Sequence, residues 1–232
     1  MTFDWQAGVV VVAAIILTTQ LGTFLAFKVP ALHRMREINR EQDALKKTKK
    51  RFRAGIKASM QVGLATNLIF FLLLVPFVVT LEAKPAWRYV TDVVLVLLTF
   101  DFFYYLVHRG LLHGVPYFKR IHALHHEVRK PTHVDAFYVH PLETFIGQAI
   151  FMGSVIGLGA LVGPFHAGSV AAAYLLYVQL NLINHTYVDL PYFPFKTLNW
   201  ITTKHAIHHI DMNKGNYATI TMIYDYMFGT LE

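Results

Sequence analysis

Histidines that could bind metal ions stand in four groups in this chain, each at the end of an apolar segment or just beyond one. Two groups repeat the pattern His-x-x-His-His, in IHALHH and KHAIHH. Positions i, i+3 and i+4 share one face of a helix, so we expect each triple to aim its imidazoles at one point. Imidazole is the commonest metal ligand in proteins, and nine converging rings suit two ions better than one. The nine candidate ligands are His108, His113, His122, His125, His126, His185, His205, His208 and His209.

Three further histidines fit the ordinary roles of an isolated histidine, which is more often a hydrogen-bonded core or surface residue than a metal ligand. His33 lies in a basic segment, His133 in a polar loop and His166 in a short turn between apolar stretches. We expect all three to be bystanders. Chance would have to place six imidazoles on two helical faces to explain the triples, which favours a metal site for the clustered histidines.

Composition places these histidines in a membrane protein. Hydrophobic residues make up 55% of the chain and charged residues only 15%, against roughly 25% in an ordinary soluble domain. We expect an all-α integral membrane bundle of four to five transmembrane helices with a histidine-rich cap. The expected spans, each near the ~20 residues that cross a bilayer, are residues 8–29, 58–81, 89–107, 144–163 and 167–188. A shorter re-entrant hairpin over residues 144–188 would serve equally well.

Two regions are expected within one integrated membrane domain. Residues 1–100 form an N-terminal transmembrane region with a basic cytoplasmic loop, and residues 101–232 form the region that carries the chemistry.

Lysine and arginine are distributed unevenly enough to orient the bundle. Residues 30–57 carry ten of the 21 basic residues, the turn at 82–88 carries two and the turn at 164–168 carries none. The positive-inside rule therefore places residues 30–57 and the histidine cap on the cytoplasmic face, with the N-terminus outside. Residues 1–4 hold no basic side chain, so we expect the first span to be a signal anchor. The membrane would be the inner (plasma) membrane of a bacterium or the endoplasmic reticulum of a eukaryote.

The net charge of +7 has a membrane explanation as well. Much of it lies in residues 30–57, where it can anchor the chain to anionic headgroups, and Phe52 is the only aromatic residue of that segment. We therefore expect no nucleic-acid partner. The chain contains no cysteine, which rules out disulfides, thiolate ligands and iron–sulfur clusters.

Neighbouring side chains could orient the histidines, because a ligating histidine usually donates its second N–H to a carboxylate or a carbonyl. Asp101 and Tyr105 share a helical face with His108 and could support it from beneath. His140 and Glu143 either belong to such a support or mark an ordinary helix start around Pro141.

The pair His108 and His113 is less regular than the triples. A step of five residues leaves the two rings about 140° apart on an α-helix. Either the helix ends at this point or a wide turn intervenes, and Gly110 and Gly114 would make such a break inexpensive.

Three histidine-containing segments resemble those of the fatty acid hydroxylase superfamily, the sterol desaturase-like membrane enzymes. They are DFFYYLVHRGLLH (101–113), KRIHALHH (119–126) and TKHAIHH (203–209). Three more segments are similar to the connector of the sterol desaturase branch, to the segment with the isolated histidine and to the family's ending: PTHVDAFYVHPLE (131–143), NLINHT (181–186) and NYATITMIYDYMFGTLE (216–232). The resemblance covers residues 101–232 in the family's order, whereas residues 1–100 match only in hydropathy.

The resemblance implies a non-haem di-iron centre, held by the nine histidines, that takes O2 as co-substrate and oxidises an unactivated C–H bond of a lipid. The product would be an alcohol or a double bond. Zinc can replace the two iron ions in purified protein, because it ranks above ferrous iron in the usual affinity order. The fatty acid 2-hydroxylase branch has a second histidine where this chain has Asn181, which disfavours that branch and leaves Asn181 as a candidate ligand through water.

Electrons would have to come from outside, because no flavin, haem or nicotinamide motif is visible in the sequence. A ferredoxin or a cytochrome is the expected donor. Basic residues around the histidines could dock it, although their charge fits a cytoplasmic loop equally well: Arg109, Lys119, Arg120, Arg129 and Lys130. The alternative function is a membrane metal-binding protein or metal transporter without oxygenase activity. A transporter would need ionisable ligands along its spans rather than at their ends.

Overall fold

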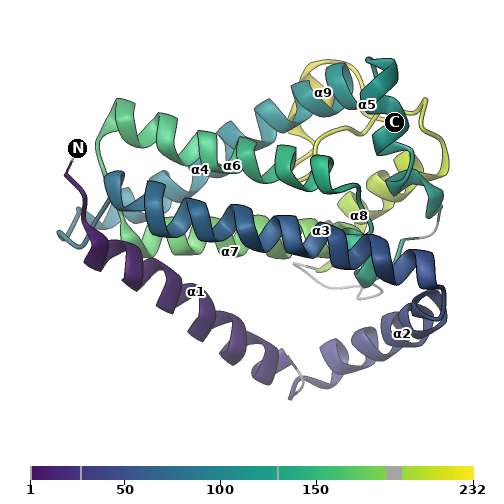
Figure 1. Ribbon diagram of the computed structural model, residues 1–232, viewed down its shortest axis with the longest axis horizontal. Helices are drawn as coiled ribbons and strands as arrows, with labels where there is room; N and C mark the ends of the chain where they lie inside the picture. Colours follow the sequence, from purple (N-terminus) through teal and green to yellow (C-terminus); the bar gives the residue numbers. More distant parts are fainter. Residues whose placement is uncertain (1, 27, 130, 187–194) are drawn as a thin grey trace.

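Long helices make up most of the computed structural model, which describes residues 2–26, 28–129, 131–186 and 195–232 (Figure 1). The long helices are α1 (Trp5–Ala26), α2 (Pro30–Lys47), α3 (Lys50–Ile69), α4 (Ala86–Val107), α6 (Pro141–Val162), α7 (Ala167–Asn184) and α8 (Phe195–Ile210). Helix α3 continues through a π-helical segment, η1 (Phe70–Leu74), and a 3-10 turn, η2 (Val75–Phe77). Shorter pieces form the cap: the π-helix η3 (His108–Leu112), α5 (Pro116–His122), the 3-10 helices η4 (His125–Glu127) and η5 (His133–Phe137), and α9 (Ile223–Met227).

Four helical segments of the described chain are long and apolar enough to cross a membrane. They are Trp5–Ala26, Lys50–Phe77, Ala86–Leu112 and Pro141–Val162. The expected all-α membrane bundle is therefore confirmed, and the chain is an integral membrane protein. The fifth expected span corresponds to α7, which has 18 residues and carries Gln179, Asn181 and Asn184 in its last two turns. These polar residues lower the mean hydropathy of α7, which is therefore not among the four. Residues 187 and 188 of that expected span lie outside the described part of the chain.

Helix α7 joins the transmembrane segments to the cap. It packs against α1, α4 and α8, while α6 packs against α3 and α4 (Figure 1). The core between these helices is aromatic, and Phe70, Phe100 and Phe151 in it are fully buried. Helix α1 is buried only near its start, and the rest of it leans away from the bundle toward α2 (Figure 1).

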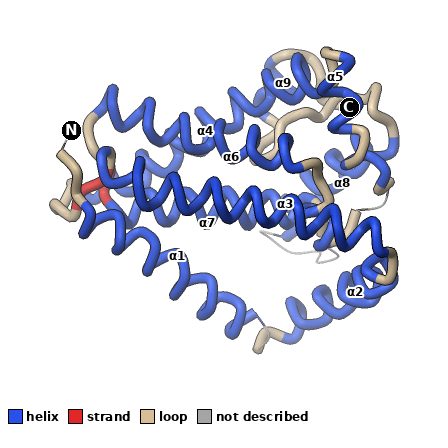
Figure 2. The backbone as a smooth tube through the Cα atoms, in the orientation of Figure 1, coloured by secondary structure: helices blue, strands red, loops and turns tan. Residues whose placement is uncertain are grey.

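A small parallel pairing closes the end of the bundle opposite the cap. Strand β1 (Val79–Thr80) pairs with β2 (Phe165–His166), which ties two connections together (Figure 2). Gly159 of α6 faces this closure, and a Cβ at that position would lie 2.8 Å from the Cβ of Val78. A side chain there would force the connection away from α6, so the close packing depends on glycine.

The basic helix α2 lies at the same end of the bundle as the histidine cap (Figure 1). Lys46 forms an ion pair with the buried Asp135 of η5. Asp43 accepts hydrogen bonds from the Thr132 hydroxyl at 2.7 Å and from the Val134 N–H at 3.3 Å. The basic segment 30–57 and the loop that carries the first histidine triple thus share one end, as the topology requires. That this end faces the cytoplasm stays a prediction.

Because the chain has no cysteine, single cysteines can report its orientation. We expect Glu82→Cys to react with a membrane-impermeant maleimide on intact cells, whereas Thr197→Cys should react only after the membrane is opened. Both residues are exposed, and Glu82 follows β1 whereas Thr197 belongs to α8, at the opposite end of the bundle (Figure 1). Labelling of Thr197→Cys from outside intact cells would overturn the proposed orientation.

Candidate metal centre

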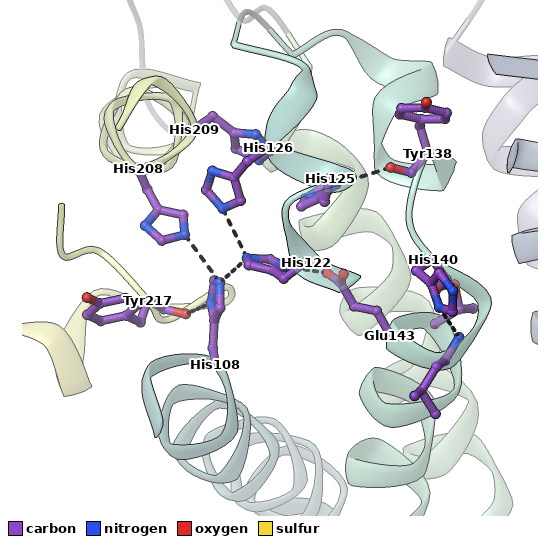
Figure 3. A network of polar contacts seen from close by, with 12 residues as sticks. His108, His122, His125, His126, Tyr138, His140, Glu143, His208, His209 and Tyr217 are labelled. Atoms are coloured by element: carbon purple, nitrogen blue, oxygen red, sulfur yellow. Dashed lines mark hydrogen bonds and ion pairs between the residues drawn. The ribbon is translucent and has the colours of Figure 1, made fainter. Parts of the chain in front are cut away.

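The nine predicted histidines converge on two adjacent groups at the cap end of the bundle. Figure 3 shows His108, His122, His125, His126, His208 and His209. Site A, as we call the first group, consists of His108, His113, His122, His126 and His208. Site B consists of His125, His185, His205 and His209. Within each group the candidate ligand nitrogens lie within 4.8 Å of one another. Each group could therefore hold one metal ion.

Each His-x-x-His-His triple is divided between the two sites, so the expectation that a triple aims at one point is wrong. In the first triple, His122 and His126 belong to site A and His125 belongs to site B. In the second triple, His205 and His209 belong to site B and His208 belongs to site A. Adjacent residues on a helix point about 100° apart, which sends neighbouring histidines to different sites. In the first triple the backbone also changes, because α5 ends at His122 and a 3-10 helix begins at His125.

A π-helical turn resolves the irregular spacing of His108 and His113. Segment η3 follows α4 directly, and the His113 N–H donates to the His108 carbonyl at 3.0 Å, an i+5 hydrogen bond. The wider turn brings two residues five apart onto nearly the same side. Their ring centroids are 5.0 Å apart, so both side chains reach site A. Of the two alternatives, the wide turn is the one adopted.

Most of the nine histidines donate their Nδ1–H to an oxygen of the protein. The acceptors are Tyr217 O for His108 (2.6 Å), Glu143 Oε1 for His122 (2.8 Å), Tyr138 O for His125 (3.4 Å), Asn181 O for His185 (2.9 Å), Gly215 O for His208 (2.9 Å) and Val128 O for His209 (3.1 Å). With the proton on Nδ1, each ring turns an unprotonated Nε2 toward the centre of its site. Figure 3 shows the Tyr217, Tyr138 and Glu143 contacts.

The spacing of these Nε2 atoms fits bound metal ions. Nε2 of His108 lies 3.0 Å from Nε2 of His122 and 3.2 Å from that of His208. In site B, Nε2 of His125 and Nε2 of His185 are 3.1 Å apart. None of these nitrogens has a hydrogen to donate in this tautomer, so their lone pairs face one another and repel. Adjacent ligands of an ion at a metal–nitrogen distance of about 2.1 Å would lie about 3.0 Å apart at an angle of about 90° and about 3.4 Å apart at the tetrahedral angle.

Two buried carboxylates hold the segment that orients His108. Asp101 accepts backbone N–H groups from Thr219 at 3.0 Å and from Ile220 at 2.9 Å. Asp225 accepts those of Tyr217 and Ala218, both at 2.8 Å. The two carboxylates together fix the segment 217–220, whose Tyr217 carbonyl accepts the His108 proton. Asp101 therefore supports the site through the C-terminal segment rather than by direct contact with a histidine.

Asp225 and the carbonyls that accept histidine protons were not found from the sequence. The only signal for Asp225 is an acid in the mostly apolar ending of the chain, where it is fully buried. Position 215 requires glycine, because a Cβ there would lie 1.8 Å from the Thr230 carbonyl oxygen. This close approach lets the Gly215 carbonyl reach His208.

The other proposed supporting residues take different roles. Glu143 accepts from His122, as a supporting carboxylate should. His140 accepts the Leu142 N–H at 3.1 Å and caps α6, which is the helix-start alternative. The Tyr105 hydroxyl contacts Thr230 and accepts from Arg109, so it fastens the C-terminal turn and touches no histidine among the described contacts.

Asn181 contacts a candidate ligand through its main chain. Its carbonyl oxygen accepts the Nδ1–H of His185. Its side-chain oxygen accepts the Thr219 hydroxyl at 2.8 Å, and its side-chain NH2 donates to the Tyr177 carbonyl at 2.8 Å. These contacts favour a positioning role over that of a ligand through water, which stays a hypothesis.

The expected bystanders lie outside both sites. His33 is exposed on α2 and contacts Glu37, and His133 is exposed in η5. His166 caps α7 at the opposite end of the bundle by accepting the Gly168 N–H at 3.0 Å.

Burial keeps the cap histidines unprotonated at neutral pH. It lowers the pKa of His113 and of His126 to about 3, and repulsion from His208 adds to the effect in both cases. Burial likewise holds the pKa of His205 and of His209 well below the ordinary value, with smaller contributions from neighbouring histidines. An unprotonated imidazole is the form that binds metal, so the protein prepares the ligands before any ion arrives.

The chain matches a known family over the region that builds this centre. A family model described as fatty acid hydroxylase matches residues 93–230. A putative methylsterol monooxygenase of Dictyostelium discoideum is 32% identical over 138 residues, which cover 57% of this chain and 47% of the relative. Methylsterol monooxygenase 1 of Rattus norvegicus is 34% identical over 134 residues, or 56% of this chain and 43% of the relative.

Another relative carries a different name. A very-long-chain aldehyde decarbonylase of Oryza sativa subsp. indica is 32% identical over 152 residues, which cover 63% of this chain and 54% of the relative. The chain thus spans about half the length of the curated relatives it matches. No solved structure matches the chain.

We expect the purified protein to bind about two metal ions per chain, chiefly through imidazole nitrogen. His126→Ala in site A and His205→Ala in site B should each lower the metal content and abolish turnover, because each removes a ligand from one group. His33→Ala and His166→Ala are the controls and should keep the wild-type metal content and the wild-type activity. Elemental analysis that finds no tightly bound metal in a folded, detergent-stable sample would contradict this assignment.

The metal-free protein should lose stability as the pH falls. The unfolded chain takes up protons on histidine as the pH passes about 6.5, whereas His113 and His126 in the folded chain stay neutral down to about 3. The free energy of unfolding should therefore decrease between these values, and thermal unfolding in detergent would measure it. His126→Asn should make the decrease shallower. An unfolding temperature that is constant across this window would show that the histidines are not held neutral.

Proposed function

The chain belongs to the fatty acid hydroxylase family, and we propose that it is a membrane-bound, non-haem di-iron oxygenase that hydroxylates or desaturates a lipid. The observation that carries the proposal is the pair of adjacent all-histidine sites at the end of an apolar helical bundle. The similarity to methylsterol monooxygenases favours a sterol-like substrate, and the similarity to an aldehyde decarbonylase keeps a long-chain lipid in consideration.

All nine histidines are proposed as ligands of two iron ions. Imidazole also suits zinc and copper, so the choice of iron comes from the family. Iron, when bound, would supply the activation of O2 that the oxidation of an unactivated C–H bond requires. The chain contributes neutral ligands whose rings are fixed by carbonyls and by Glu143, so that little rearrangement accompanies binding.

The position of the sites suits a substrate that stays in the bilayer. Two apolar spans border site A, because Ala86–Leu112 ends beside His113 and Pro141–Val162 begins just before Glu143. A lipid can therefore bring a C–H bond to the site without leaving the hydrocarbon. The aromatic core beneath, with Phe100 and Phe151 fully buried, keeps bulk water away from that side.

Electrons are proposed to come from a soluble or membrane-bound donor such as a ferredoxin or a cytochrome. Exposed basic residues of the cap could dock an acidic partner: Arg109, Lys119, Arg120 and Arg129. Lys130, the fifth residue of this set, lies outside the described residues.

A metal transporter is the weaker alternative. Transport ligands should follow one another along a path through the membrane. Here His108 lies at the last turn of its span, and the other candidate ligands belong to the cap or to the end of α7.

Turnover should require O2, ferrous iron and an external reductant, and should act on a lipid. We would supply a ferredoxin or cytochrome system and a total lipid extract, then follow by mass spectrometry the gain of one oxygen atom or the loss of two hydrogen atoms. The inactive His126→Ala protein is the matched control. Anaerobic processing of a water-soluble substrate by the iron-loaded protein would refute the proposal and favour a hydrolytic metal site.

A further inference from the structure

Two tyrosines line the interior of the bundle beneath site A. Tyr104 lies one helical turn before His108 on α4, and the two ring centroids are 5.3 Å apart. Tyr177 reaches in from α7, with its ring stacked on Phe151 at 4.6 Å and in edge contact with Phe100 at 4.8 Å. Three helices thus bring aromatic rings together in one place, and the fully buried Phe100 and Phe151 form its floor.

Helix α6 supplies the remaining wall. Glu143, Gly147 and Phe151 follow one another at intervals of four residues and therefore lie on one face of the helix. Glu143 contacts site A through His122. A Cβ on Gly147 would lie 3.8 Å from Cε2 of Tyr104 and 3.9 Å from the hydroxyl oxygen of Tyr177. Both tyrosines therefore approach the one position of this face that has no side chain.

The polar atoms around Gly147 lack partners. Among the contacts of the described residues, neither the Tyr104 hydroxyl nor the Tyr177 hydroxyl forms a hydrogen bond, and both rings pack against Phe100. The second carboxylate oxygen of Glu143, one turn away on the same face of α6, is fully buried without a partner. Unpaired polar groups in an apolar interior are costly, so they mark a place where a ligand can complete the hydrogen bonding.

We propose that Tyr104 and Tyr177 select the substrate by binding a hydroxyl group of the lipid. A hydroxyl both donates and accepts, and two phenols can meet both needs at once. Gly147 lies about 6 Å along the helix axis from Glu143, and the Tyr104 ring lies 5.3 Å from the ring of His108 in site A, so the bound hydroxyl stands close to the carbon that site A oxidises. The inference rests on the proposed function and adds the chemical class of the substrate: a lipid with an oxygen function close to its reactive C–H bond.

Direct binding tests this selection without turnover. We would load the full chain with zinc, reconstitute it in lipid nanodiscs and measure the binding of radiolabelled probes in two pairs. One pair is 1-octadecanol and octadecane, and the other is cholestan-3-ol and cholestane. Comparing the alcohol-to-hydrocarbon preference between variants cancels the partitioning of each probe into the nanodisc. We expect Tyr104→Phe and Tyr177→Phe each to reduce that preference about fivefold for at least one pair, and the double variant to reduce it further.

Tyr174→Phe is the matched control, because Tyr174 packs against the same Phe151 and Tyr177 rings but lies about one turn farther from His185 and does not approach Gly147. It should keep the wild-type preference. Gly147→Leu should weaken the binding of every probe by filling the space between the phenols. A preference that survives both Tyr→Phe changes, or that Tyr174→Phe lowers equally, would overturn the inference. The binding measurement does not depend on the oxygen-dependent assay. A lipid oxygenase whose tyrosines do not bind a hydroxyl would pass the oxygen-dependent assay and would contradict only the present inference.

Discussion

The cap holds the lone pairs of nine imidazoles close to one another. Left without a cation, nitrogens about 3 Å apart with no hydrogen between them repel, and the fold must hold them against that repulsion. For most of the rings it does so from behind, with an oxygen that accepts the Nδ1 proton: a carbonyl for His108, and a carboxylate for His122. The free energy of a bound metal would then stabilise an arrangement that the protein alone maintains at a cost.

That requirement explains why residues far from the histidines in sequence are built so rigidly. The segment behind His108 forms neither a helix nor a strand, and the carboxylates of Asp101 and Asp225 accept its N–H groups in succession. Asn181 and Asn184 fasten the same segment to α7 through Thr219. The C-terminal segment is thus a fixed frame for the metal centre, held by charge-assisted hydrogen bonds within an apolar bundle.

Sequence patterns were sufficient for the parts that depend on composition and spacing. Hydropathy predicted the membrane bundle, and the repeated triples, the pair His108/His113 and the placement of His185 predicted which nine histidines meet. The division of each triple could not be predicted, because it depends on where α5 gives way to a 3-10 helix. The same holds for the π-helical turn after α4, which spacing left open. Carbonyl acceptors and Asp225 were out of reach because they depend on tertiary contacts that no local pattern encodes.

The division of the triples makes the two sites interdependent. Helix α8 contributes to both, and so does the stretch from α5 into η4, so an ion in one site acts on the backbone that presents ligands to the other. The first ion removes the lone-pair repulsion that these shared elements hold, and the second then binds to elements under less strain. Loading of the centre should be cooperative, with the half-filled form scarce at any metal concentration. A cell that is short of the metal would then contain fully loaded and empty molecules rather than a population with one site filled.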